Sequence, residues 1–309
     1  MNAKQISAFR AVMISGSMVG AAKMLYISQP AVTRLIKDLE ENCGFALFER
    51  RSSRLFPTPE AESLYQEVKR HFMGLDQLSR SIDQIKTQRT DRLRIAAMPA
   101  LSYSILPRVV SGFLRQHENV SLTLNPCSSI EATELIGSQQ FDLGIVHLPV
   151  DTREISFYRC YRTTCKLICP QDHPFSRQTT IETAQLNGEP FVAIGDQNPL
   201  TRYRIDSALH GSNIKPNQTV ETPMFSTAQA LVSEGLGVSI VDPYTAHMFT
   251  EQGGISRDFS ADIPFYFGFI YPVNKQISSL AEEFINSFES QTQGMTVLQQ
   301  IRPEDIDLK

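Results

Sequence analysis

The alternation of hydrophobic and polar residues near the start of the chain predicts two short helices joined by a tight turn. The first helix covers residues 18–25 and follows Ser17, whose hydroxyl can accept hydrogen bonds from the free amides at a helix start. Small residues at positions 20–22 allow another helix to approach closely. Tyr26 and Ile27 then form the turn. In this order of elements, the first helix and the turn hold the second helix in position against the surface of another molecule.

The second helix has an apolar face and a polar face. Its apolar residues recur at steps of three and four, as expected for a face that packs inward. They are Val32, Leu35, Ile36, Leu39 and Cys43. The start and the opposite face carry Ser28, Gln29, Pro30, Thr33, Arg34 and Lys37. Arginine can bond guanine, glutamine can pair with adenine, threonine can contact the thymine methyl group, and lysine can hold a phosphate. The polar face therefore predicts a helix that reads DNA, and an ordinary amphipathic surface helix is the alternative.

A basic turn that contains serine follows the second helix. Gly44 is expected to end that helix, and apolar strand candidates at 45–48 and 55–57 flank the turn. We predict a wing whose Arg50, Arg51 and Arg54 lie near the DNA backbone or in the minor groove, where narrow A·T tracts attract arginine. A solvated charged loop is the alternative.

A long helix is predicted from Thr58 and Pro59 to about residue 88. Its apolar residues are spaced by three and four and form a stripe too narrow for a globular core. They are Tyr65, Val68, Phe72, Leu75, Leu78, Ile82 and Ile85. We interpret this segment as a dimerisation helix, with packing against its own domain as the alternative. Two-fold pairing would suit a partly palindromic DNA site.

From Leu93 onward, short apolar strands alternate with helical stretches, which is the pattern of a mainly parallel sheet covered by helices. The first set has strands at 93–97, 120–125, 142–147, 155–161 and 164–169, with helices at 103–116 and 130–139. The second set has strands at 190–194, 217–222, 237–241 and 263–271, with helices at 200–210, 226–235, 243–250 and 277–290. Two α/β lobes joined by crossing strands follow from this order. The polar tail from Gln291 to Lys309 is expected to be partly disordered.

Composition and charge narrow the class of protein. The chain has 309 residues, 41% hydrophobic and 20% charged, which fits two or three folded domains. Residues 1–58 hold eight Lys and Arg against four Asp and Glu, whereas residues 59–309 hold 21 against 29. Positive charge is thus concentrated in residues 1–58, the segment predicted to contact DNA phosphates. No run of eighteen apolar residues and no apolar secretion signal is present, so we expect a cytoplasmic protein without membrane contact.

The five cysteines point to reduced, buried thiols. They stand at positions 43, 127, 160, 165 and 169, an odd number without paired CxxC spacing, which disfavours a disulfide framework or a zinc site. A redox role for Cys160, Cys165 and Cys169 is the alternative that the sequence leaves open. We expect neither a metal nor a cofactor.

The first 60 residues resemble the winged helix-turn-helix of LysR-type transcriptional regulators, without gaps in spacing. The matching residues are Ala21, Ala22, Leu25, Ser28, Gln29, Pro30, Ala31, Val32, Thr33, Ile36, Leu39, Glu40, Gly44, Leu47, Phe48, Arg50 and Thr58. Thr33, Cys43 and Ala61 depart from the residues common in that family. Beyond position 100 the resemblance lies in length and order of elements.

The resemblance implies an α+β multidomain protein. It would have a DNA-binding domain at 1–58, a linker and dimerisation helix at 59–89 and an effector-binding domain at 90–300, followed by a tail at 301–309. The effector-binding domain would resemble type 2 periplasmic binding proteins, with lobe I at about 90–162 and 266–300 and lobe II at about 163–265. Implied partners are double-stranded promoter DNA, a small effector, a second copy through the linker helix and a homotetramer, and RNA polymerase is kept open as a further partner.

In such sheets ligands bind at the carboxyl ends of strands, where helix amino ends also point. The residues collected there are Ala100, Ser102, Ser128, Ser129, His147, Asp196, Phe225, Ser226, Thr227 and Asp242. The hydroxyls suit a carboxylate, and Asp196 and Asp242 could hold an ammonium group. For any one of these residues a helix cap or a turn is the commoner role, and the prediction of a ligand site rests on the set as a whole.

We therefore expect an amino acid or an amino-acid derivative as effector. Residues 97–101 and 106–108 also resemble family members that sense basic amino acids and opines. Two rival functions are a hydrolytic enzyme with His147 or His117 as base and a cytosolic solute receptor. The sequence contains no GxSxG, HExxH or Gly-rich phosphate loop, which disfavours the enzyme. The basic amino-terminal region disfavours the receptor.

Overall fold

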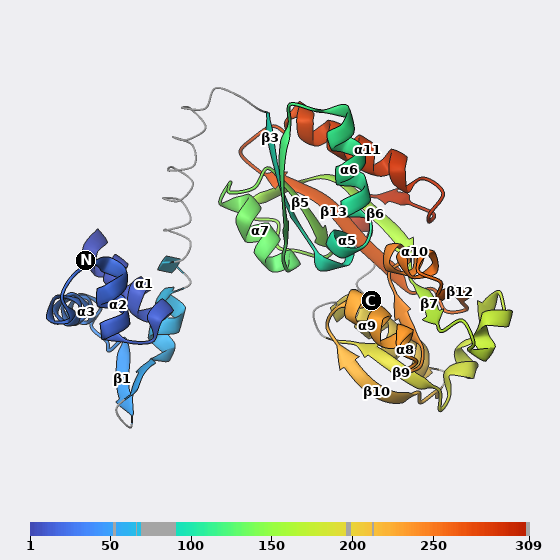
Figure 1. Cartoon of the computed structure of the whole chain (residues 1–309), viewed down its shortest axis with the longest axis horizontal. Helices are drawn as coiled ribbons and strands as arrows, with labels where there is room; N and C mark the ends of the chain where they lie inside the picture. The colour runs from blue at the N-terminus through green and yellow to red at the C-terminus, as the bar shows by residue number, and fades with distance from the viewer. Residues whose placement is uncertain (52–53, 66, 69–90, 196–198, 212, 307–309) are drawn as a thin grey trace. The chain divides into compact units, whose positions relative to one another are not determined.

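The computed structural model describes residues 1–51, 54–65, 67–68, 91–195, 199–211 and 213–306. The chain divides into two compact units, Met1–Gln88 and Arg89–Lys309, called here the smaller and the larger unit. Figure 1 shows the elements of each unit with their labels.

The smaller unit contains the predicted helix-turn-helix. Its helices are α1 (Ala3–Ser15), α2 (Met18–Leu25) and α3 (Gln29–Cys43), followed by an antiparallel hairpin of β1 (Phe48–Arg51) and β2 (Arg54–Pro57). The buried core joins Phe9 and Val12 of α1 to Ala21 of α2 and to Ile36 and Leu39 of α3. Burial of the small Ala21 side chain confirms the close approach of helices that the small residues predict.

Local hydrogen bonds fix the ends of these helices where the sequence places them. The Ser17 hydroxyl accepts from the Gly20 amide at 3.0 Å and begins α2, and Gly44 ends α3 in the left-handed conformation. The Thr58 hydroxyl accepts from the Ala61 amide at 3.1 Å, which begins the next helix. Glu40 accepts from the Leu47 amide at 2.7 Å and so ties α3 to the hairpin.

The predicted dimerisation helix is described only at its start. Residues 59–65 and 67–68 are helical, and Phe72, Leu75, Leu78, Ile82 and Ile85 lie outside the described residues. Val68 is buried in the core of the smaller unit, and the Tyr65 ring packs edge-on against Phe9 at 6.2 Å between centroids. The first two residues of the apolar stripe therefore pack within their own chain, as the alternative interpretation expected.

The first lobe of the larger unit is built on a six-stranded sheet in the order β14-β6-β13-β5-β3-β4. Its strands are β3 (Arg92–Ala97), β4 (Ser121–Pro126), β5 (Leu143–His147), β6 (Ile155–Thr164), β13 (Pro264–Pro272) and β14 (Gln299–Ile301). Strand β3 is parallel to β4 and β5, whereas β13 is antiparallel to β5 and β6, so the sheet is mixed. Helices α6 (Leu106–Gln116) and α11 (Ser279–Thr292) lie side by side, and α7 (Ser129–Gly137) packs against β3, β5 and β13.

The second lobe contains two smaller sheets. One has the order β11-β7-β12-β8, with β7 (Lys166–Cys169), β8 (Thr180–Ile181), β11 (Ser239–Val241) and β12 (Ile255–Phe259). The other pairs β9 (Pro190–Ile194) with β10 (Asn217–Thr222) in parallel. Helices α8 (Pro199–Gly211), α9 (Phe225–Ser233) and α10 (Pro243–Glu251) belong to this lobe, with 3-10 turns at Pro174–Arg177 and Thr183–Leu186.

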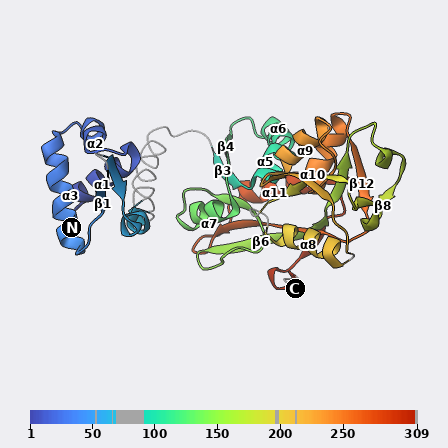
Figure 2. The same ribbon diagram turned by 90° about the horizontal axis from the view of Figure 1, so that it is seen from below.

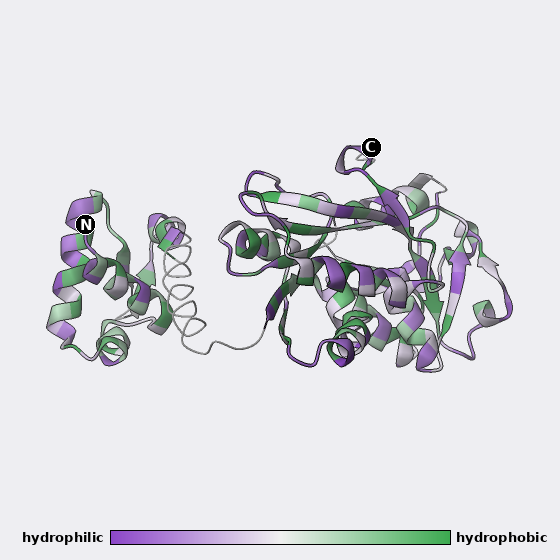
Figure 3. Cartoon of the chain, turned by 90° about the horizontal axis from the view of Figure 1, so that it is seen from above, coloured by the Kyte–Doolittle hydropathy of each residue, from purple (hydrophilic) through white to green (hydrophobic). Residues whose placement is uncertain are grey.

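The long strands β6 and β13 cross between the lobes, as predicted (Figures 1 and 2). In Figure 3 hydrophobic segments follow the central strands of the larger unit. Aromatic rings of β13 and α11 fill the first lobe, where Phe267 and Phe269 lie 5.9 and 5.3 Å from Phe288 between ring centroids. The core is therefore continuous with the strands that connect the lobes.

The larger unit departs from the sequence prediction in several features, the first being that its six-stranded sheet is mixed and not mainly parallel. The helix predicted at 103–116 is two helices, α5 (Pro99–Tyr103) and α6, which are separated at Ser104 and Ile105. The tail is ordered in part, because β14 pairs with β6 and a 3-10 turn follows at Pro303–Asp305. Strands β8 and β12 are further elements that the sequence pattern did not predict.

Candidate DNA-reading face and effector cavity

The polar face of α3 is exposed in the smaller unit. Gln29, Pro30, Thr33, Arg34 and Lys37 are all exposed, as is Ser28, while Val32, Ile36 and Leu39 on the opposite face are buried. Among the residues that the structure describes, Lys37 has only a long contact with Glu41, 3.9 Å between Nζ and Oε1, and both side chains are mostly exposed. Such a pair contributes little to stability, so the Lys37 ammonium is available to a phosphate.

The hairpin that follows α3 supports the predicted wing. Strands β1 and β2 pair from Phe48 and Pro57 to Arg51 and Arg54, which puts the arginines at the end next to the connecting turn. The side chains of Arg50, Arg51 and Arg54 lie outside the described residues. Their contact with DNA stays a prediction.

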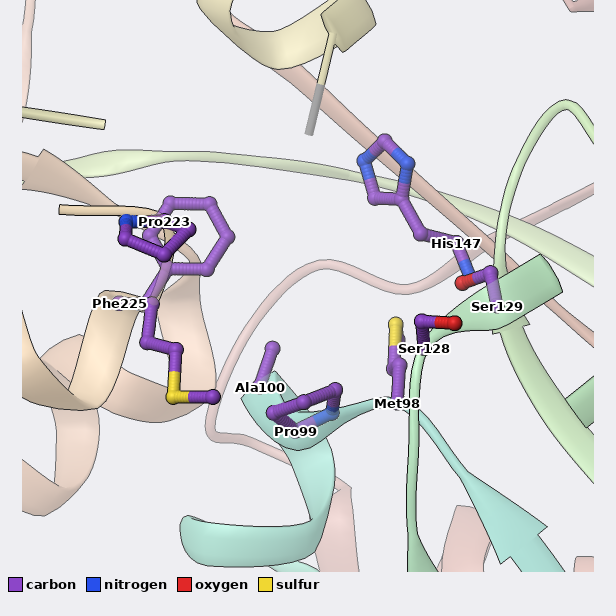
Figure 4. Close-up of a pocket in the computed structure, with 9 residues that line it drawn as sticks. Met98, Pro99, Ala100, Ser128, Ser129, His147, Pro223 and Phe225 are labelled. Atoms are coloured by element: carbon purple, nitrogen blue, oxygen red, sulfur yellow. The ribbon is translucent and has the colours of Figure 1, made fainter. Parts of the chain in front are cut away.

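A cavity lies between the two lobes of the larger unit, as Figure 4 shows. Its cavity volume is about 30 Å³, and about 380 Å³ of space free of protein atoms surrounds it when open solvent is included. The first lobe contributes Met98, Pro99, Ala100, Ser128, Ser129 and His147, and the second contributes Pro223, Met224 and Phe225. Five of the predicted effector-binding residues therefore meet here, namely Ala100, Ser128, Ser129, His147 and Phe225.

His147 is the most enclosed polar side chain of this cavity. Its Nε2 atom lies 3.1 Å from the Thr201 hydroxyl of α8, a contact that joins the two lobes. Its backbone amide donates to the Ser129 hydroxyl at 2.9 Å. Burial lowers the pKa of His147 from 6.5 to about 4, so the imidazole is neutral at pH 7. It can exchange a hydrogen bond with a ligand but offers no positive charge.

Three helices begin at the wall of this cavity. Met98, Ser128 and Met224 are the N-cap residues of α5, α7 and α9, and all three line it. The Ser128 hydroxyl accepts from the Glu131 amide at 3.1 Å, whereas α5 and α9 have no side-chain capping bond within the described residues. Free backbone amides and the positive ends of helix dipoles favour an anion.

Four other predicted effector-binding residues do not line this cavity, namely Ser102, Ser226, Thr227 and Asp242. The Ser102 hydroxyl is buried and donates to the Ala97 carbonyl at 3.1 Å. Ser226 and Thr227 lie in the first turn of α9 but outside the lining. Asp196 lies outside the described residues.

Asp242 caps α10 and is fully buried, so it is unavailable to a ligand's ammonium group. It accepts hydrogen bonds from the amides of Tyr244 and Thr245 at 3.0 and 3.1 Å and from the Thr245 hydroxyl. This is the turn and cap role that the sequence left open for an aspartate before proline.

The predicted set of effector-binding residues did not include Pro223, Met224 or Thr201. Pro223 and Met224 directly follow β10, which ends at Thr222, so the rule that found the other residues would have found them too. Thr201 had no such signal, because it lies inside a helix and reaches His147 only in the folded lobes.

Four of the five cysteines are buried, and burial raises the pKa of their thiols. Cys127, Cys160, Cys165 and Cys169 are buried, and no disulfide links the cysteines of the chain, all five of which lie within the described residues. Burial raises the pKa of the Cys160 thiol to about 12 and that of Cys169 to about 11, and raises that of Cys165 well above 9.0. The reactive thiolate is therefore disfavoured at neutral pH.

No cluster of three or more His, Cys, Asp or Glu side chains in the described ranges could hold a metal ion. Among the helices that the structure describes, none has both the length and the apolar character required to cross a membrane.

The fold and the two sites define a protein that joins a winged helix-turn-helix to a two-lobed ligand-binding unit. The family model for the LysR substrate binding domain matches residues 86–293, and the model for bacterial regulatory helix-turn-helix proteins of the lysR family matches residues 3–62. The chain therefore belongs to the LysR family of bacterial transcriptional regulators, and it is a DNA-binding regulator with an effector-binding domain.

Individual relatives agree with this assignment over nearly the whole chain. Regulatory protein NocR of Agrobacterium fabrum (strain C58) is 34% identical over 286 residues, which cover 92% of this chain and 94% of NocR. The octopine catabolism/uptake operon regulatory protein OccR of Rhizobium meliloti is 33% identical over 291 residues, covering 94% and 96%. The crystal structure of CbnR, a LysR family transcriptional regulator, superposes with a TM-score of 0.70 at 17% identity, covering 95% of this chain and 100% of CbnR.

Proposed function

We propose that the regulator responds to an amino acid or an amino-acid derivative bound through its carboxylate in the cavity between the lobes. The observation that carries this proposal is the meeting of the N-termini of α7 and α9 at one cavity in which burial keeps the His147 imidazole neutral. The name of OccR refers to octopine, an amino-acid derivative, which supports the same class of ligand.

In this proposal Ala100, Ser128, Ser129, His147 and Phe225 contact the effector. The hydroxyls of Ser128 and Ser129 and the amides at the starts of α7 and α9 hold the carboxylate, while Phe225 covers apolar atoms. Among the lining residues that the structure describes there is no acidic side chain. Asp196 therefore stays the predicted partner of an ammonium group.

We further propose that the effector shifts the arrangement of the lobes and, through the linker helix, the spacing of two DNA-binding heads. Coupling of this kind is typically about 1–3 kcal/mol. The operating unit would be a homodimer through the linker helix, assembled into a homotetramer in the cytoplasm, with domain limits at 58, 89 and 300. Bases would be read by Gln29, Thr33 and Arg34, with Ser28, Pro30, Lys37, Arg50, Arg51 and Arg54 around them.

A thermal-shift comparison tests the class of effector. Octopine, arginine and lysine should raise the melting temperature of the full-length protein, whereas benzoate should not. At a ligand concentration of 100 Kd the gain in stability is about 2.7 kcal/mol. Stabilisation by benzoate alone would refute the amino-acid assignment.

The substitution Ser128→Asp tests the carboxylate site itself. Aspartate caps helices as well as serine does, so the fold of α7 should be kept, while its charge repels a carboxylate ligand. We expect the melting temperature without ligand to stay within about 2 °C and the ligand-induced shift to disappear.

Ser278→Asp is the matched control, because the Ser278 hydroxyl caps α11 in the same way, accepting from the Ala281 amide at 3.2 Å, outside the cavity lining. This variant should keep the full ligand-induced shift. An unchanged shift in Ser128→Asp would show that the anion binds elsewhere.

A further inference from the structure

Tyr26 holds a backbone conformation that tyrosine rarely adopts. It ends α2 with φ 55° and ψ 38°, in the left-handed region that glycine and asparagine occupy more readily. Its side chain is 95% exposed, the largest fraction among the exposed large hydrophobic side chains of the described residues. Packing within this chain therefore does not offset the strain.

The position of Tyr26 connects it to the DNA-reading face. The residues from Tyr26 to Pro30 form one uninterrupted exposed segment, and this segment leads into the exposed face of α3. In helix-turn-helix proteins the N-terminal residues of the second helix contact base edges in the major groove. Docking of this kind would bring a side chain three residues before Gln29 near the duplex backbone that borders the groove.

The chemistry of the side chain suits this place. Tyrosine is one of the residues that donate hydrogen bonds to phosphate oxygens and sugars, and its ring can pack against a sugar without a charge. Glycine or asparagine would hold the same turn with less strain but would offer no such contact. The turn itself needs the left-handed conformation, since the Tyr26 and Ile27 amides donate to carbonyls at the end of α2, but it does not need a tyrosine. Residues held in strained conformations are frequent at functional sites.

We propose that Tyr26 binds the sugar-phosphate backbone of the DNA, with its hydroxyl donating to a phosphate oxygen beside the bases that α3 reads. The contact is independent of base sequence, so it adds affinity and fixes the register of α3. It carries no charge, so the salt dependence of binding does not change with it.

Two variants of the full-length protein test this proposal. Tyr26→Phe keeps the ring and the backbone and removes only the hydroxyl. It should lower the affinity for the upstream promoter and for a random duplex alike, by roughly threefold to tenfold, as expected for the net contribution of one hydrogen bond. The slope of log affinity against log salt should stay unchanged.

Tyr26→Gly should lower DNA affinity further, while the melting temperature of the smaller unit stays the same or rises because glycine adopts the left-handed turn freely. These opposite effects separate a DNA contact from a folding defect. Tyr203→Phe is the control, since Tyr203 on α8 is also exposed, at 56%, and should leave DNA binding unchanged.

Wild-type affinity in both Tyr26 variants would overturn the proposal and direct attention to a protein partner for this side chain. A loss confined to the promoter would overturn it as well, because it would make Tyr26 a reader of bases. If Tyr26→Gly lowers the melting temperature, the DNA affinity of Tyr26→Phe alone tests the proposal, because that substitution keeps the ring and the backbone. Failure of the wild-type protein to bind any duplex would instead contradict DNA binding itself.

Discussion

Asp242 is a buried carboxylate held by three hydrogen bonds from the helix that it caps. Burial nevertheless raises its pKa from 3.8 to about 6. Between these two pH values the unfolded chain has lost the proton that the folded chain keeps, so ionisation disfavours the folded state as pH rises. A difference of two pKa units corresponds to about 3 kcal/mol, which is fully expressed above pH 6.

Asp242→Asn should therefore become stabilising relative to wild type as pH rises. The amide can accept the two backbone hydrogen bonds without a buried charge, so the difference in free energy of unfolding between variant and wild type should grow by about 2–3 kcal/mol from pH 4 to pH 7. Urea denaturation of the larger unit at both pH values measures it. A difference that is the same at pH 4 and pH 7 would contradict the raised pKa.

His147 titrates in the opposite sense, because its lowered pKa makes the folded state lose stability as pH falls from 6.5 towards 4. Comparing variant and wild type at the same pH cancels this effect. Asp172→Asn is the control, since Asp172 is exposed and its substitution should change stability by less than about 0.5 kcal/mol.

The sequence predicted several residues that line the cavity between the lobes, but it could not decide the role of each predicted residue. Strand ends and helix starts predict where Ala100, Ser128 and His147 lie, because topology alone brings those ends together. Whether a polar side chain faces the cavity or its own backbone depends on rotamer and burial. Ser102 and Asp242 bond to their own backbone, and no pattern in the sequence distinguishes them from residues that face the cavity.

At the scale of elements, periodicity predicted the helices and strands that have a buried face. It failed where the pairing is carried by the backbone alone, as in β14, whose exposed glutamines bond to β6 through main-chain groups. The break between α5 and α6 did have a signal, because Pro107 stands in the first turn of α6, where proline commonly marks a helix start. The spacing of apolar residues continues across Ser104, so the sequence pattern suggested one helix and concealed this break.

Two substitutions test whether α3 reads bases while the hairpin contacts the DNA backbone. Arg34→Ala should remove a contact with a base edge and reduce the preference for promoter over random DNA by about 1–3 kcal/mol. Arg51→Ala should weaken binding to all duplexes and reduce the salt slope by about one. Titrations with both duplexes at several salt concentrations measure both effects. Equal losses on both duplexes for Arg34→Ala would remove Arg34 from base reading.

At the scale of the whole molecule, charge is divided between the DNA-binding and effector-binding parts. Residues 1–58 carry an excess of basic residues, and residues 59–309 carry an excess of acidic ones. The acidic part is repelled by the duplex and so favours contact through the basic part. The net charge of -4 for the whole chain conceals this division.

The two compact units should also unfold separately, and the effector should stabilise only one of them. Ala21 is fully buried where α2 packs on α1, so Ala21→Leu overpacks the smaller unit by about 1–3 kcal/mol. In scanning calorimetry this should lower one transition by about 4–20 °C and leave the other in place. A stabilising effector should raise only the transition that Ala21→Leu leaves unchanged.

Ala230→Leu on the exposed face of α9 is the control and should move neither transition by more than about 2 °C. If Ala21→Leu lowers both transitions together, or if the wild type melts in a single step that the effector shifts as a whole, the units are energetically coupled without DNA. Separate transitions would mean that the coupling between effector and DNA needs the assembled, DNA-bound state, because a signal can pass only between parts whose stabilities depend on each other.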